Sequence, residues 1–233
     1  MNNESKSGLA DKGNERAEAA RYALTRRLLP VLRHHMVVNL QPIGMIYEVL
    51  DRKMAGSEPD MAPIREGLGK INTLARSAIG SCLDVVTWLA PDPAAVTGLG
   101  AGVEECLELL SNNFRFRGFN TVNDVGDATF QVSQPALREV LTAALMAATD
   151  GADGPVELRI SAQSEPERTR LTIDTRPGDG TGFSTELAYR SLTWGDVEAL
   201  AQEHRTAFTR DGTLVTLTYP FVLVAAPEAS SGG

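Results

Sequence analysis

LPVLRHHMVVNLQPIGMIYEVL, residues 29–50, carries an apolar residue at every third or fourth position. An α-helix turns by about 100° per residue, so this spacing places the apolar side chains on one side of a helix. The resulting stripe consists of Leu29, Leu32, Met36, Leu40, Ile43, Tyr47 and Leu50. The stretch therefore predicts a long amphipathic helix.

A turn-forming segment, MAGSEPD at residues 54–60, ends this helix and leads into a second apolar stripe. The two helices predict an antiparallel hairpin, which alone has too little partner surface to bury both stripes. We therefore expect two hairpins to form a four-helix bundle in a homodimer. The second stripe consists of Met61, Ile64, Leu68, Ile71, Ala75, Ile79, Cys82, Val86 and Leu89.

The second half of the chain alternates between helical and strand-like patterns. Because its strands come in adjacent pairs, helices on one face of a mixed sheet fit better than a doubly wound parallel sheet. The expected fold is thus α followed by α+β, with a two-layer α/β sandwich after the hairpin. Helices are predicted at 100–115 and 134–149, clear strands at 155–162, 168–175 and 213–220, and weaker strands at 120–125 and 129–132.

These patterns predict five segments. Polar composition predicts that both ends of the chain are disordered. The segments are a disordered tail at 1–14, the helical hairpin at 15–89, a linker (APDPAAVTG) at 90–98, the α/β sandwich at 99–224 and a disordered tail at 225–233.

Composition excludes several classes of protein. The net charge is −8, whereas a nucleic-acid-binding surface needs a basic excess, so we expect no nucleic-acid partner. Cys82 and Cys106 lie in apolar segments without metal-binding spacing, which predicts buried, reduced thiols. No apolar run approaches the roughly 18 residues of a membrane span, and the polar N-terminus does not predict a signal peptide. We expect a cytoplasmic protein without membrane contact.

The two adjacent histidines fall on different sides of the predicted helix. Relative to Met36 on the apolar stripe, His34 lies almost opposite and His35 lies on the flank. Apolar residues share the outer side with His34, which indicates either a docking surface or a strip that packs on the second domain. They are Val31, Val38, Met45 and Val49.

Two further features lie around His34. Pro30 and Pro42 bracket it, and each is expected to kink a helix, although Pro30 equally fits the start of the helix. Basic residues also precede His34 and form either a collar that attracts an acidic partner or an ordinary solvated face shared with Glu15 and Glu18. These basic residues are Arg16, Arg21, Arg26, Arg27 and Arg33.

HHMVVNLQPI, residues 34–43, resembles the phosphoacceptor box of histidine kinases, in the subgroup whose box reads roughly H-R-x-x-N-N-L-Q-x-I. His34 matches the phosphorylated histidine, and Asn39, Leu40, Gln41 and Ile43 match the positions after it. ALREVLTAALMAATDGA, residues 136–152, resembles the signature helix of the kinase ATP-binding domain, and GTLVTLTYP its last strand. The resemblance covers most of the chain and implies a dimerisation hairpin followed by an ATPase-like domain.

The departures from that family concern ATP. Where its signature helix carries two asparagines, one of which supports magnesium, this chain has Ala143 and Ala147, and a methyl group cannot coordinate a hard cation. Thr175 stands where the family has its adenine-reading aspartate, unless a register shift brings in Asp174. No glycine-rich lid is recognisable between residues 182 and 212, and GDGTGF lacks the helix that should follow a dinucleotide loop. We expect that the chain binds no cofactor.

His35, the residue after the expected phosphoacceptor, is a further departure that concerns ATP. Histidine kinases place an acidic residue there that assists attack on ATP, whereas this chain has His35. The resemblance therefore implies a dimeric histidine phosphotransferase that exchanges phosphoryl groups with receiver domains, either of response regulators or of a hybrid histidine kinase. The receiver would supply the magnesium. His34 is the expected acceptor, with His35 as an assisting or alternative acceptor and with Val31, Arg33, Val38, Arg27 and Met45 as docking residues.

Two other functions remain open for this sequence: a non-catalytic scaffold that binds a receiver or kinase, and a divergent active kinase. A metalloenzyme is not indicated, because adjacent histidines diverge on a helix and no carboxylate or cysteine lies one turn away. His204 has no evident partner and is expected at the surface. No GxSxG motif of a serine hydrolase is present.

Overall fold

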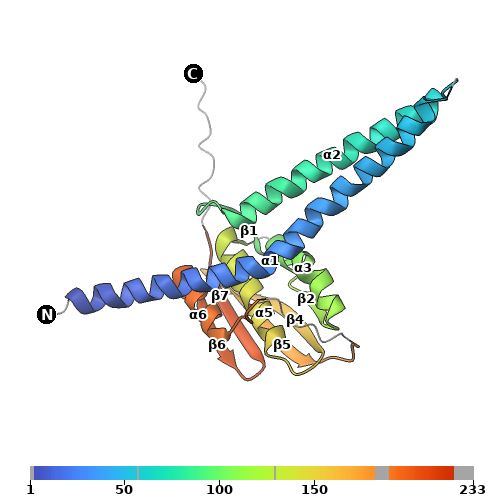
Figure 1. Cartoon of the computed structure of the whole chain (residues 1–233). Helices are drawn as coiled ribbons and strands as arrows, with labels where there is room; N and C mark the ends of the chain where they lie inside the picture. Colours follow the sequence, from blue (N-terminus) through green and yellow to red (C-terminus); the bar gives the residue numbers. More distant parts are fainter. Residues whose placement is uncertain (1–2, 57, 129, 182–188, 223–233) are drawn as a thin grey trace, which may run out of the picture. The chain divides into compact units, whose positions relative to one another are not determined.

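The computed structural model describes residues 3–56, 58–128, 130–181 and 189–222 (Figure 1). It divides into two compact units. One, the hairpin unit, spans Arg27–Pro91, and the other, the α/β unit, combines Met1–Arg26 with Asp92–Gly233. The predicted boundary before the hairpin, at residue 15, thus differs from the unit boundary after Arg26. In the described ranges, no helix is both long and apolar enough to cross a membrane.

Helix α1 (Asn3–Met54) runs through the beginning of both units. Residues 3–14, which the sequence predicted to be disordered, are the first turns of this helix. No proline occurs before Pro30, so nothing in the backbone interrupts a helix there. Pro30 and Pro42 both lie inside α1, so the alternative that Pro30 begins the helix was wrong.

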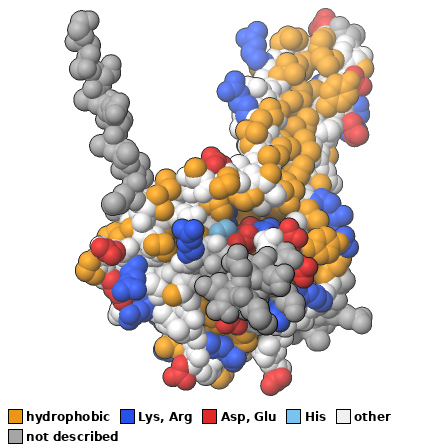
Figure 2. All heavy atoms as spheres, turned by 90° about the vertical axis from the view of Figure 1, so that its left-hand side faces the viewer, with side chains coloured by type: hydrophobic (Ala, Val, Ile, Leu, Met, Phe, Trp, Pro, Cys, Tyr) orange, Lys and Arg blue, Asp and Glu red, His pale blue; other side chains and the backbone are white. Residues whose placement is uncertain are grey.

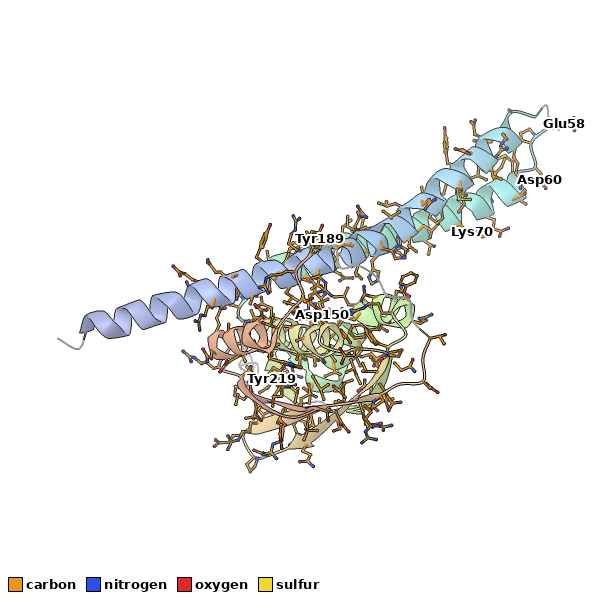
Figure 3. The ribbon with its side chains drawn as sticks, turned by 60° about the horizontal axis from the view of Figure 1, so that its bottom comes forward. Glu58, Asp60, Lys70, Asp150, Tyr189 and Tyr219 are labelled. Carbon is orange, nitrogen blue, oxygen red and sulfur yellow. The ribbon has the colours of Figure 1, made fainter. Side chains whose placement is uncertain are left out.

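Helix α2 (Met61–Leu89) begins and ends where the second apolar stripe predicted. The side chain of Asp60 caps its first turn by accepting a hydrogen bond from the amide of Ala62 at 3.0 Å. Glu58 and Asp60 lie at the tip of the hairpin, where α1 and α2 are joined (Figure 3).

Within the hairpin unit, the two helices pack through a narrow seam. Leu50 of α1 lies so close to Gly67 of α2 that a Cβ on this glycine would meet a Leu50 methyl at 2.6 Å. Leu32 is also buried, as are Ile64 and Ala78 of α2. The rest of both predicted stripes is only partly covered. Figure 2 shows hydrophobic side chains gathered along the hairpin.

The α/β unit contains a five-stranded sheet of order β2-β4-β5-β7-β6, in which β2 and β4 are parallel and the other neighbours are antiparallel. Helices cover one face of this sheet (Figure 1), which confirms the predicted two-layer arrangement with a mixed sheet. β1 (Val96–Gly98) and β3 (Gln131–Ser133) form a separate antiparallel pair. The strands of the sheet are β2 (Asn120–Asp124), β4 (Val156–Ser164), β5 (Arg168–Pro177), β6 (Ala207–Asp211) and β7 (Leu214–Pro220).

The core of this unit lies between the sheet and its helices. Period-two alternation along β4, β5 and β7 directs their large apolar residues inward, where the helices meet them. Tyr219 lies in this layer with no exposed hydroxyl (Figure 3). Burial raises the pKa of Tyr219 well above its usual value. The helices are α3 (Leu99–Phe116), α4 (Gln134–Ala136), η1 (Leu137–Leu141), α5 (Thr142–Asp150) and α6 (Trp194–Glu203).

Most predicted elements of this unit are present, and three elements were not predicted. Helix 134–149 is present but contains a wider π-helical turn, η1. The end of the predicted linker, residues 96–98, forms β1. α6 and β6 lie in a region where the sequence suggested no element. α6 begins with a capping box between Thr193 and Asp196, a local signal that could have revealed it. The predicted tail at 225–233 lies outside the described residues.

Candidate functional site

His34 and His35 lie on the part of α1 that belongs to the hairpin unit. His34 is exposed, and His35 is half-buried. This is the difference that helical geometry predicted for the two rings, because His34 falls opposite the buried stripe. An exposed imidazole can reach a phosphoryl group on another protein, so the geometry is compatible with His34 as acceptor. The assignment of the acceptor stays a prediction.

An apolar strip accompanies His34 on the outer side of α1. Val38 and Met45 expose 52% and 64% of their surface, and Val49 is also exposed. Val31 is half-buried, and Arg33 is exposed beside His34. Together these residues offer apolar contact around the imidazole and one positive charge beside it.

The basic residues that precede His34 do not form a uniform collar. Arg21 is held by two carboxylates: its Nε lies 3.0 Å from Glu139 Oε1, and its Nη2 lies 2.6 Å from Glu203 Oε2. The guanidinium of Arg26 lies over the rings of Tyr22 and Tyr189, the second of which is labelled in Figure 3. Arg21 and Arg26 are therefore engaged by residues of the α/β unit, and the collar, one of the two interpretations left open by the sequence, does not extend to these two.

His204 also has a partner, contrary to the sequence-based expectation. Its Nε2 lies 2.8 Å from Glu139 Oε2, and its side chain is only 17% exposed. Glu139 projects from the π-turn η1 and so bridges Arg21 of α1 and His204 after α6. We call these three residues the Glu139 cluster. Burial raises the pKa of Glu139, but hydrogen bonds from His204 and Arg21 outweigh this effect and hold its pKa below the usual value.

The Glu139 cluster lies where the first part of α1, which belongs to the α/β unit, packs on the rest of that unit. Four small or apolar residues of this helix are buried there, which brings the helix close to its neighbours and lets Arg21 reach Glu139. No local pattern could have revealed the contact, since Arg21 and Glu139 are 118 positions apart. The buried residues are Ala17, Ala20, Ala23 and Leu24.

The two alanines that stand where the resembled signature helix carries asparagines are both buried. Ala143 is completely buried, and Ala147 lines a hollow of about 440 Å³ in the α/β unit. Thr175, Trp194 and Arg210 line the same hollow, with the Arg210 guanidinium over the Trp194 ring. The described part of the chain has no cluster of three or more His, Cys, Asp or Glu side chains able to hold a metal ion.

The two candidates for the adenine-reading position differ in their surroundings. Thr175 faces the hollow. Asp174 instead pairs with Arg176 at 2.6 Å and lies opposite Arg159 in the sheet register. The predicted glycine-containing stretch at 178–183 falls partly outside the described residues.

No family model matches the chain, and no curated protein matches it. The chain is similar to solved histidine kinase structures. AdeS of Acinetobacter baumannii matches at 15% identity and a TM-score of 0.40, over 81% of this chain and 96% of that chain. A histidine kinase from Burkholderia phymatum matches at 15% identity and 0.40, over 80% and 96%. A bacterial phosphotransferase matches at 13% and 0.36, over 84% and 95%. These identities and TM-scores assign no activity to the chain.

Proposed function

We propose that the chain is a histidine phosphotransferase that exchanges a phosphoryl group with the aspartates of receiver domains through His34, in the cytoplasmic location expected from its sequence. The observation that carries the proposal is the exposed His34 within an apolar outer strip, in a sequence that resembles a phosphoacceptor box. Receiver domains, free or at the end of a hybrid kinase, are the proposed partners.

The transfer uses little chemistry from this chain. A neutral imidazole nitrogen of His34 attacks the phosphorus of the receiver's aspartyl phosphate. The new N–P bond forms as the P–O bond to the aspartate breaks, and the carboxylate leaves. The reverse reaction passes the group to a second receiver. Magnesium belongs to the receiver, where it neutralises phosphoryl charge, while this chain orients the imidazole. His35 is half-buried and is the assisting or alternative acceptor.

The docking residues in this proposal are those that lie on the same side as His34. Val38 and Met45 supply exposed apolar area, and Val31 extends it. Arg33 supplies a positive charge toward the acidic pocket of a receiver. Arg27 completes the predicted set.

We also propose a homodimer through the hairpin. Each helix also carries an exposed apolar strip that is separate from the strip around His34. The strip of α1 lies about 60° round the helix from buried Leu50, and the strip of α2 lies about 50° from buried Ile64, both in the same rotational sense. Because the helices are antiparallel, equal offsets bring both strips to one side of the hairpin. A second hairpin would cover that side in a four-helix bundle. The strips comprise Leu29, Leu40, Tyr47, Met54, Met61, Leu68, Ile79 and Val86, all exposed in the single chain.

The proposal assigns no ATP binding to the α/β unit. Ala143 and Ala147 offer only methyl groups at the expected metal-supporting positions, and Ala143 has no exposed surface. A methyl group gives magnesium no oxygen ligand at either position, so the proposal takes the phosphoryl group from a receiver.

The test is transfer of labelled phosphate from receivers of the same genome, charged with acetyl phosphate and magnesium. The wild-type chain should gain a label that is acid-labile and alkali-stable, as a phosphoramidate is. His34→Ala should abolish labelling and leave dimerisation intact, because His34 is exposed, whereas His35→Ala should at most slow it.

Three results would contradict parts of the proposal. Loss of transfer in His35→Ala but not in His34→Ala would move the acceptor by one residue. Binding of a receiver without any labelling would favour the scaffold. Labelling of histidine from labelled ATP and magnesium would favour a divergent kinase.

A further inference from the structure

Asn39 is a polar residue on the side of α1 that faces α2. It lies seven residues after Leu32 and eleven before Leu50, which are about two and three helical turns. Both leucines are buried, Leu50 against Gly67 of α2, and Asn39 is half-buried between them along the helix. An apolar residue here would bury more apolar area, whereas the carboxamide brings a polar group to the side of α1 that faces α2.

Hydrogen bonds give this carboxamide a defined orientation. Asn39 Nδ2 donates to Ser81 Oγ on α2 at 3.0 Å, and Ser81 Oγ donates to the carbonyl oxygen of Ser77 at 3.1 Å. The single proton of the serine hydroxyl is thus used toward Ser77, and Ser81 can only accept from Asn39. The chain of donors runs in one direction, from α1 across the seam into α2.

The same carboxamide also reaches the histidine pair. Asn39 Nδ2 lies 3.4 Å from the carbonyl oxygen of His35, a second and longer hydrogen bond. Nearby, Pro42 has no amide proton, so the carbonyl of Val38 lacks its helical donor. The helix ladder is therefore weakened just beyond the histidines, at the place where Asn39 ties α1 to α2.

We propose that Asn39 is a positioning residue for phosphoryl transfer at His34, acting by fixing the register of α1 against α2. A single asparagine in an apolar helical seam specifies register at a cost in stability, because only one alignment satisfies its hydrogen bonds. This inference rests on the proposed phosphotransfer and names a further residue for it.

Register matters at His34 because we expect the docked receiver to rest on α2 as well as on the docking residues of α1, so that the alignment of the two helices sets where the imidazole meets the phosphorus. A shift of α1 by one residue would move His34 by about 1.5 Å along the helix and turn it by about 100°. In-line attack needs the nitrogen and phosphorus in near-contact alignment, and a displacement of about 1 Å can slow a reaction about a hundredfold. The apolar contacts of the seam are non-directional, so they do not select one register as sharply as the hydrogen-bond chain does.

The test replaces each end of the bond and measures transfer from an acetyl phosphate-charged receiver. Asn39→Leu should leave the melting temperature unchanged or raise it, while the maximal transfer rate falls about ten- to hundredfold at an unchanged half-saturating receiver concentration. Ser81→Ala should slow transfer similarly, and the double variant should be no slower than the worse single variant. Ser81→Thr keeps the hydroxyl and should transfer normally.

Ser77→Ala is the matched control, because the backbone carbonyl that accepts from Ser81 remains. It should behave as the wild type. Normal transfer by Asn39→Leu, with His34→Ala inactive, would overturn the role of Asn39 and leave the phosphotransferase proposal standing. A parallel fall in melting temperature, dimerisation and transfer would show general structural damage and also overturn it. If no receiver labels the wild type, the proposed function and this inference fail together.

Discussion

The α/β unit and the hairpin unit differ in how they cover their apolar side chains. In the α/β unit, Leu141, Leu158 and Ile173 have no exposed surface. In the hairpin, Leu68 and Ile79 expose 55% and 62% of theirs. The first unit thus satisfies its own hydrophobic pattern, while the second presents an apolar side that needs another surface. The comparison places a closed apolar core in one unit and most of the uncovered apolar side chains of the two predicted stripes in the other.

The charges of the two units show the same difference. In the α/β unit, Arg21, Glu139 and His204 hold one another at close range, away from most of the solvent. In the hairpin unit, His34 and Arg33 are exposed. The Glu139 cluster is thus held inside one unit, whereas His34 and Arg33 lie at the surface of the other.

A leucine-to-alanine substitution in each unit should separate a role in folding from a role in dimerisation. It has the largest expected effect on stability. Leu141→Ala should lower the free energy of unfolding of the α/β unit by about 2–5 kcal/mol, because it leaves a cavity in a closed core. Leu68→Ala removes an exposed side chain and should cost a single chain almost nothing. It should instead raise the concentration needed for dimerisation, as measured by sedimentation or light scattering.

The comparison fails if the two variants behave alike. A large loss of folded-state stability in Leu68→Ala at concentrations where the wild type is monomeric would show that Leu68 is covered within one chain. A wild-type chain that remains monomeric at micromolar concentration would contradict the proposed homodimer.

The next effect concerns the Glu139 cluster. Glu139→Gln should lower the free energy of unfolding by about 1–3 kcal/mol, because the single acceptor oxygen of a carboxamide cannot replace both carboxylate oxygens and the negative charge between Arg21 and His204 is lost. Glu203→Gln is the control. This carboxylate is 34% exposed and contacts the same arginine, so its loss should cost less than about 1 kcal/mol.

Glu139 also gives this prediction a pH dependence with a definite sign. Its pKa is lowered in the folded state, so its contribution is present above the unfolded-state pKa of about 4.3 and is lost as the pH falls through the folded-state value. Wild-type and Glu139→Gln melting temperatures should therefore converge as the pH falls below about 4.3 and through the lowered folded-state pKa of Glu139. A difference that stays constant from pH 7 to pH 3 would show that packing, not charge, explains the effect.

Periodicity in the sequence predicted what depends on local spacing. It predicted the hairpin and the strands β4, β5 and β7, because side chains at period 3.6 or 2 share a face. It also predicted that His34 faces outward. It missed β6, a short and largely exposed edge strand without alternation, and α6, whose signal was a capping box.

Contacts between distant positions were not predictable in the same way. Glu139 and His204 are 65 positions apart, and each looks like an ordinary surface residue in its own segment. The hydrogen bond from Asn39 to Ser81 joins residues that are 42 positions apart, and it depends on the register of α1 against α2. The hydrophobic pattern alone tolerates neighbouring registers, so the sequence identifies the side of the helix but not the polar partner.

The smallest expected effect tests whether the charge beside His34 serves a partner. Arg33→Ala should slow association with a receiver a fewfold at low ionic strength, and the difference should vanish near 0.5 M salt, because exposed charges are screened beyond about 10 Å already at 0.1 M. Arg52→Ala is the matched control: Arg52 is exposed on the same helix, 18 residues after His34 and five turns along the same side, about 27 Å away. Stopped-flow association over a salt series should separate the two variants. Equal effects of both would show that only net charge matters, whereas a salt-independent loss in Arg33→Ala would show that Arg33 makes a short-range contact with the receiver instead of steering it.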